Sequence, residues 1–121
     1  MAAFLDKINK RKFDATALGW SSPFEGDPYQ VWHISQADVE NSSNFITYKN
    51  QNASDLIDQA RVEFDVVKRN SLYWKFQAIL HEDQPYTFMF SAPSIVAVSK
   101  KFTNVKVHKS GLDLKEWKIK K

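Results

Sequence analysis

The strongest constraint on this chain is a helix that must end at a proline and pass directly into an apolar extended segment. Residues 72–90 read LYWKFQAILHEDQPYTFMF. Four apolar residues recur at the spacing that places them on one face of a helix: Leu72, Phe76, Ile79 and Leu80. Pro85 cannot continue a helix, and it biases Gln84 away from helical dihedrals. Because Tyr86–Phe90 is apolar and aromatic, it predicts a strand that begins where the helix ends.

Capping signals predict the other helices. Residues 4–8 favour a short helix, and Asp27-Pro28 predicts a second helix that runs to about residue 36. Asn52, with Asp55 three residues later, predicts the start of a third helix. Asp65 is expected to cap the helix of the 72–90 stretch, so the last two helices should pack as a hairpin. The buried stripe of the third helix is expected to comprise Leu56, Ile57, Ala60 and Phe64.

Short apolar segments predict the strands. These segments are residues 13–18, 45–48, 86–90, 95–98 and 105–107. With the helices between them, they predict an α/β or α+β fold in which helices, including the hairpin, cover one mixed sheet. The 121 residues suffice for one small core, so a single domain over residues 1–121 is expected.

Composition excludes several classes of protein. Hydrophobic residues make up 43% and aromatic residues 14%, which is typical of a globular rather than a disordered chain. No apolar run approaches the roughly 20 residues that a membrane span needs. In MAAFLDKINKRKFDA the basic residues follow the apolar ones and no long apolar region exists, so no signal peptide is expected. The absence of cysteine excludes disulfides and cysteine catalysis.

Positive charge is concentrated near the C-terminal end. Residues 100–121 hold eight lysines against Asp113 and Glu116, a net +6, whereas the whole chain carries +3. One interpretation is a small module that binds nucleic acid or an acidic protein. The other is that these lysines solvate edge strands and a chain terminus. The second is favoured because the segment has no arginine and few aromatic residues.

No residue pattern indicates catalysis, a metal or a cofactor. His33, His81 and His108 are far apart in the sequence and make no paired-ligand spacing. The serine pairs lack the glycines of a nucleophile elbow, and three glycines in the whole chain make no phosphate-binding loop. A small hydrolase built on His33 or His81 is therefore the least favoured hypothesis, and no cofactor is expected.

Four segments in order resemble part of a known family. Around the helix–proline junction the match is carried by Arg69, Leu72, Tyr73, Gln77, Ile79, Leu80, Glu82, Asp83 and Pro85. KFDATALGW…DPYQVWH and SNFITYKNQNASDLIDQAR precede it, and SIVAVSKKFTNVKV with a final glycine and tryptophan follows. Over residues 12–117 these segments resemble the C-terminal part of the family 5 extracellular solute-binding proteins, the peptide- and oligopeptide-binding receptors of bacterial ABC importers.

The resemblance implies a fold and a non-enzymatic function. Family members are two-lobed periplasmic binding proteins of type II, several times longer than this chain, with a peptide or other small solute between the lobes. This chain would be a C-terminal piece of one lobe, in a periplasmic or cell-envelope parent that docks on an ABC permease. No nucleic acid is expected. Surfaces left exposed in the isolated chain predict a homo-oligomer by strand exchange, through Phe88, Phe90, Ile95 and Val96.

The expected ligand-binding residues are Gly19, Trp20, Ser21, Glu25, Asn44 and Phe45. Ligands of open α/β sheets bind outside the carboxyl ends of strands, which points to Gly19 and Trp20 after residues 13–18. Glycine permits a close backbone approach, and an indole offers an apolar wall with a donor. The resemblance adds Ser21, Asn44 and Phe45. The alternative role of Asn44 is that of a turn residue, and the alternative role of Phe45 is that of a core anchor.

One position departs from the family pattern. The aspartate that pairs with a peptide's α-amino group in the family falls where this chain has Ser21-Ser22-Pro23. Glu25 and Asp27 are the nearest acids, and Asp27 is better explained as a helix cap. The ligand is therefore a peptide or another small solute, which the resemblance leaves open.

Overall fold

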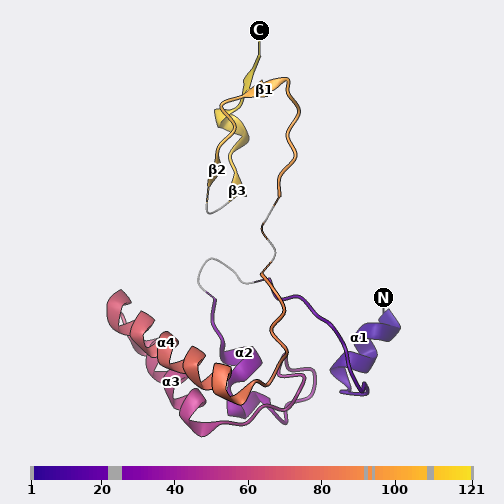
Figure 1. The fold of residues 1–121 in the computed structure, drawn as a ribbon, viewed down its shortest axis with the longest axis vertical. Coiled ribbons are helices and arrows are strands. Elements are labelled where there is room, and N and C mark those ends of the chain that lie inside the picture. Colours follow the sequence, from indigo (N-terminus) through magenta and orange to yellow (C-terminus); the bar gives the residue numbers. More distant parts are fainter. Residues whose placement is uncertain (1, 22–25, 92, 94, 109–110, 121) are drawn as a thin grey trace. The chain divides into compact units, whose positions relative to one another are not determined.

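The structure is a computed structural model that describes residues 2–21, 26–91, 93, 95–108 and 111–120. These residues form two compact units, the first from residues 2–21 and 26–88 and the second from residue 89 onward. Figure 1 labels the elements of both units. Within the described ranges the α-helices lie in the first unit and the strands in the second. A single domain over residues 1–121 stays a prediction.

The first unit is built on a helical hairpin. Helix α3 spans Gln51–Val62 and helix α4 spans Val66–Asp83, and the two run side by side (Figure 1). Three further helical elements precede them: α1, Ala2–Asn9; α2, Tyr29–Trp32; and the 3-10 helix η1, Ile34–Gln36. The predicted hairpin is confirmed.

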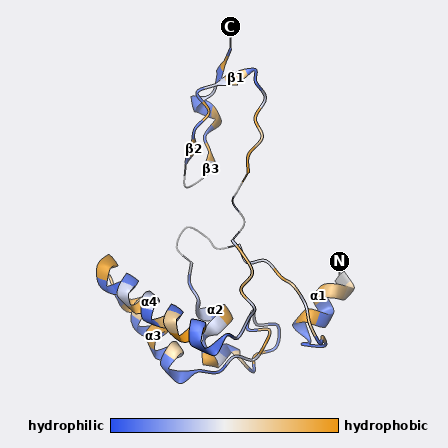
Figure 2. Ribbon diagram, in the orientation of Figure 1, coloured by the Kyte–Doolittle hydropathy of each residue, from blue (hydrophilic) through white to orange (hydrophobic). Residues whose placement is uncertain are grey.

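The core lies between the two helices of the hairpin. Ile57 of α3 is fully buried and packs in one cluster with Phe76 and Leu80 of α4. Ile79 packs against this cluster and Leu72 is half-buried, so the predicted apolar face of α4 is confirmed. In Figure 2, hydrophobic and hydrophilic residues alternate along both helices, as expected where each buries one stripe.

Each helix of the hairpin begins at a side-chain cap, an asparagine for α3 and an aspartate for α4. The carboxylate of Asp65 accepts the N–H groups of Val67 at 2.8 Å and Lys68 at 3.2 Å, which confirms the predicted cap of α4. The predicted cap of α3 at Asn52 is wrong by two residues. Asn50 is the cap, because its extended backbone lets Oδ1 accept the N–H of Ala53 at 3.1 Å.

Helix α4 ends as the proline requires. Gln84 adopts a left-handed backbone conformation with φ 43° and ψ 50°, which avoids the right-handed helical region that a following proline disfavours. Its N–H still donates to the carbonyl of Leu80 at 3.0 Å, and its side-chain amide donates to the carbonyl of His81 at 2.6 Å. These bonds satisfy carbonyls that the helix end leaves open.

Several predicted elements differ in the structure. Residues 13–18, 86–90 and 95–98 form no helix and join no ladder among the described residues, where no neighbouring strand supplies their hydrogen bonds. Residues 45–48 are not a strand: residues 45–46 form a turn closed by the N–H of Thr47, which donates to the carbonyl of Asn44, and Thr47 has φ 55°. The predicted helix to residue 36 is interrupted at His33, whose extended backbone ends α2 and begins η1.

Phe64 is also placed differently from its prediction. It lies beyond the end of α3, in the turn before α4, and 93% of it is exposed. Ile57 and Ala60 of the predicted stripe are buried and Leu56 is half-buried. The stripe therefore ends with the helix, because Asp65 starts a new helix directly after Phe64.

The second unit consists of two short antiparallel pairs. Strand β1, Phe102–Thr103, pairs with β4, Lys118–Ile119, and β2, Val107–His108, pairs with β3, Gly111–Leu112. The 3-10 helix η2, Leu114–Glu116, lies between β3 and β4. Helices with small antiparallel sheets make the chain α+β, as predicted. The mixed sheet is not found among the described residues, because these strands pair only with partners close in the sequence.

No helix in the described part of the chain is long and apolar enough to cross a membrane.

Replacing Ile57 tests the hairpin core. Ile57→Ala is expected to lower the free energy of unfolding by about 2–5 kcal/mol, because it leaves a cavity between α3 and α4. Val62→Ala, at a position of α3 that is 73% exposed, is the matched control and should change it by less than about 0.5 kcal/mol. Urea unfolding followed by circular dichroism measures both, and equal effects would contradict the core assignment.

Candidate functional site

The structure brings together two of the expected ligand-binding residues. The rings of Trp20 and Phe45 are stacked, with centroids 5.6 Å apart and planes inclined by 12°. Trp20 remains 47% exposed, and Phe45 is half-buried. The extended segment before Trp20 and the turn before α3 therefore meet in an aromatic face that solvent can reach. We call the stacked pair and its neighbours Gly19 and Ser21 the Trp20 face.

Gly19 lies beside open space. A Cβ atom built there would meet no atom within 4 Å. Packing among the described residues therefore does not require glycine at this position. Ser21 is exposed at the end of the same segment. Glu25 lies outside the described residues.

Asn44 has a different role from the rest of the expected set. It is fully buried, its Oδ1 accepts the N–H of Tyr48 at 2.8 Å, and its Nδ2 donates to the carbonyl of Tyr48 at 2.9 Å. Both functional groups of this amide are used by one backbone residue. Asn44 therefore fixes the turn that presents Phe45, which is the turn role considered from the sequence.

Arg11 secures the same turn from outside, and sequence reasoning missed it. It follows α1 in a left-handed conformation with φ 53°, where the N–H groups of Arg11 and Lys12 bond back to Ile8 and Lys7. Its Nη2 reaches the carbonyls of Val39 at 3.2 Å and Asn44 at 3.3 Å. A lone arginine after a helix gave no sequence signal for a contact more than 25 residues away.

An aromatic cluster lies around Trp32. Its ring is 4.8 Å from Tyr86, 5.8 Å from Tyr48 and 6.3 Å from Phe88, measured between centroids. The segment after Pro85 thus packs on α2 instead of entering a sheet. Burial raises the pKa of Tyr86, and its buried hydroxyl has no hydrogen-bond partner among the described residues.

The carboxylate of Asp83 connects the C-terminal end of α4 to the residues just before α3. Asp83 Oδ2 accepts the hydroxyl of Tyr48 at 2.6 Å and the side-chain amide of Asn50 at 2.8 Å. The Tyr48 hydroxyl, and then Asn50, lower the pKa of Asp83, because both donors favour the charged carboxylate. Burial, followed by the bond to Asp83, raises the pKa of Tyr48.

His33 is part of a structural network. Its Nδ1 accepts the N–H of Ser35 at 3.1 Å and so caps η1, while Nε2 lies 3.3 Å from a carboxylate oxygen of Asp58. The ring of Tyr29 stacks on the imidazole of His33, with centroids 4.3 Å apart. The guanidinium of Arg61 lies over the Tyr29 ring, 4.2 Å from its centroid. Asp27 supports this corner twice, accepting the N–H of Tyr29 and pairing with Arg61 at 3.1 Å.

No group of three or more metal-ligating side chains occurs among the described residues.

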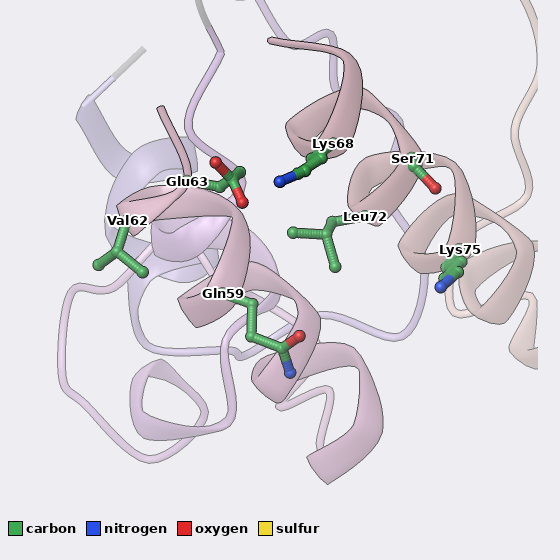
Figure 3. Close-up of a pocket in the computed structure, with 7 residues that line it drawn as sticks. All are labelled: Gln59, Val62, Glu63, Lys68, Ser71, Leu72 and Lys75. Carbon is green, nitrogen blue, oxygen red and sulfur yellow. The ribbon is translucent and has the colours of Figure 1, made fainter. Parts of the chain in front are cut away.

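A groove of about 490 Å³ lies elsewhere on the first unit, between the end of α3 and the start of α4 (Figure 3). Its lining residues are Gln59, Val62, Glu63, Lys68, Ser71, Leu72 and Lys75. None of the expected ligand-binding residues lines this groove, which we call the hairpin groove.

Comparison with known proteins agrees with part of the sequence resemblance. The chain is 29% identical over 109 residues to the oligopeptide-binding protein AppA of Bacillus subtilis (strain 168). The alignment covers 88% of this chain and 20% of that protein, so the chain corresponds to about a fifth of the length of this relative. No model of a protein family matches the chain. No solved structure matches it either.

Acid should weaken the first unit through Asp83. Because the folded-state pKa of this carboxylate is lowered, its contribution to stability is present above the pKa of the unfolded chain and is lost as pH falls through the lower, folded value. We expect the free energy of unfolding to fall on going below about pH 4, and to fall less in Asp83→Asn and in Tyr48→Phe. Urea titrations at a series of pH values measure this, and parallel curves for all three proteins would refute it.

The turn role of Asn44 predicts a stability loss. Asn44→Ala leaves the N–H and carbonyl of Tyr48 without their partners in a buried place and should lower the free energy of unfolding by about 2–4 kcal/mol. Ser43→Ala, at the neighbouring half-buried position, is the control and should cost less than about 1 kcal/mol. Thermal and urea unfolding distinguish the two, and an unchanged Asn44→Ala protein would remove the turn role.

Proposed function

We propose that this chain is a C-terminal piece of a family 5 solute-binding protein that binds oligopeptides for uptake by an ABC importer. The observation that carries this is the 29% identity to an oligopeptide-binding protein over 88% of the chain. The four segments that resemble the family, taken in order, agree with this similarity. In this proposal the chain is not an enzyme, and its parent is an envelope protein that docks on a permease.

The Trp20 face is the proposed ligand contact. Trp20 and Phe45 form a flat aromatic wall of which a large part is exposed, and the main chain at Gly19 is open on its Cβ side. An extended peptide laid along this segment would pair its backbone with the open main chain and its apolar side chains with the indole. Ser21 belongs to the proposed contact, and Asn44 contributes by holding the turn. Glu25 lies outside the described residues and stays a prediction.

Self-association by strand exchange belongs to the same proposal. The exposed fractions of the residues expected to exchange are 55% for Phe88, 81% for Phe90, 88% for Ile95 and 42% for Val96, and none of them joins a ladder among the described residues. In this proposal the segment would complete a sheet with another part of a longer parent, since the chain corresponds to about a fifth of the length of its relative.

The basic module remains the second candidate function, on one observation. The described lysines of the second unit are all exposed, namely Lys100, Lys101, Lys106, Lys115, Lys118 and Lys120. It predicts salt-dependent binding to single-stranded DNA or to an acidic peptide. A gel shift that is unchanged when residues 100–121 are removed would eliminate it.

A chimeric receptor tests the peptide proposal. The matching fifth of the Bacillus subtilis protein is replaced by this chain, and binding of a mixed oligopeptide library is measured by calorimetry. We expect the chimera to bind, and Trp20→Ala in it to weaken binding about tenfold, since an aromatic contact contributes about 1–2 kcal/mol. Gly19→Ala should weaken binding without changing thermal stability, because the added methyl meets no atom of the unit.

Trp74→Ala is the matched control, since Trp74 is a tryptophan of α4 that is 70% exposed and is not a member of the Trp20 face. A chimera that folds, judged by its melting transition, but binds no peptide would overturn the proposal. Tight peptide binding by the isolated chain would overturn the claim that it is only a piece of the receptor.

A further inference from the structure

The register of β1 and β4 sorts the side chains of this strand pair onto two faces. Phe102 lies opposite Ile119. On the next rung, Thr103 lies opposite Lys118. Directly opposed residues of an antiparallel pair share a face, and successive residues of a strand alternate between faces, so the first two side chains share one face and the last two share the other. The ring of Trp117 agrees with this division, because it packs on Phe102 with centroids 5.0 Å apart.

The face that carries Lys118 is rich in lysine. The N–H of Lys120 donates to the carbonyl of Lys101 at 2.8 Å, which continues the register by one rung and places these two lysines opposite each other. Lys118 and Lys120 flank Ile119 in the chain, so both lie on the face away from it. All three lysines are exposed. We call Lys101, Lys118 and Lys120 the lysine face.

No negative charge balances the lysine face within the described residues. The two carboxylates described in the second unit are engaged elsewhere: Asp113 accepts the N–H of Lys115 at 3.0 Å, and Glu116 pairs with His108 at 2.6 Å. None of the three lysines forms an ion pair with a described residue. Like charges directly opposite each other on a strand pair are destabilising. The lysine face is therefore an arrangement that an external anion would stabilise.

The residue types on the two faces indicate which anion fits. Proteins that bind nucleic acids favour arginine, and they stack bases on aromatic rings beside their cations. Here the rings of Phe102 and Trp117 pack on each other on the opposite face, and residues 100–121 hold no arginine. Lysine is a compact point charge on a flexible stem. Such charges suit an array of phosphates whose positions are not fixed, as at the surface of a lipid bilayer.

We propose that the lysine face binds the surface of a bilayer that contains anionic phospholipids. The ammonium groups meet the phosphates of the head groups, and the apolar face of the strand pair points away from the bilayer. Each lysine close to an anionic bilayer strengthens binding about fivefold, so three lysines give a weak and reversible contact. In the envelope protein proposed above, this contact would hold the second unit close to the membrane. It requires no peptide and no residue of the Trp20 face.

Co-sedimentation with lipid vesicles tests the proposal on the full chain. We expect the protein to bind vesicles that contain phosphatidylglycerol, and not vesicles of phosphatidylcholine alone. Added sodium chloride should release it, because the lysines are exposed and salt screens their charge. Lys101→Gln, Lys118→Gln and Lys120→Gln combined in one variant should weaken binding to the anionic vesicles by at least about thirtyfold.

A triple variant of the first unit is the matched control. Lys12→Gln, Lys68→Gln and Lys75→Gln remove the same total charge from exposed positions that do not belong to the lysine face. This variant should bind the vesicles nearly as the parent does, since charges more than about 10 Å from the bilayer are screened at about 0.1 M salt. All six side chains are exposed, so both variants should keep the melting temperature of the parent, which circular dichroism measures.

Four results would overturn the proposal. The first is a lack of binding to anionic vesicles at low salt. The second is an equal loss in the two triple variants, which would indicate an effect of net charge alone. The third is release from the vesicles by free glycerol phosphate, which would indicate a site for a single phosphate group. The fourth is tighter binding to single-stranded DNA than to the vesicles, which would assign the lysines to the basic module.

The vesicle measurement and the chimeric receptor test different parts of the chain. Loss of peptide binding in Trp20→Ala leaves the lysine face unchanged, and the lysine variants leave the Trp20 face unchanged. The failure of one proposal is therefore distinguishable from the failure of the other.

Discussion

The packing of Ile57 against Phe76 and Leu80 is the contact on which the first unit depends. It joins α3 to α4, and Tyr48 and Trp32 pack against the cluster that it forms. Through Tyr48 the contact extends to the turn at Asn44, and through that turn to Phe45 and its stacking partner Trp20. The exposed aromatic face is therefore positioned by a core whose buried members come mostly from two helices.

Local signals in the sequence were enough to predict the hairpin. The apolar spacing of α4, the cap at Asp65 and the stop before Pro85 each depend on residues a few positions apart, and the structure has all three. The cap of α3 was misplaced because Asn50 and Asn52 are equally good caps by residue type. Only the extended backbone that leaves the Asn44 turn decides between them.

Contacts between distant residues could not be predicted in the same way. Residues 13–18 and 86–90 have strand-like sequences, but a strand also needs a partner, and the described residues provide none. The turn at residues 44–48 is specified partly by Arg11, more than 30 residues earlier, whose side chain carries no local sequence signature. Of the expected ligand-binding residues, Trp20 and Phe45 meet, while the amide of Asn44 is occupied by the backbone of Tyr48.

Asp83 gives the hairpin a property that its core alone would not. It fastens Tyr48 and Asn50 to the far end of α4, while the Asp65 turn closes the opposite end. Residues 48–84 are thereby held at both ends by contacts between members of the same segment. Because these contacts involve no residue outside the segment, it is suited to condense as one unit once it has left the ribosome. Its amide protons should then be the last in the molecule to exchange with solvent.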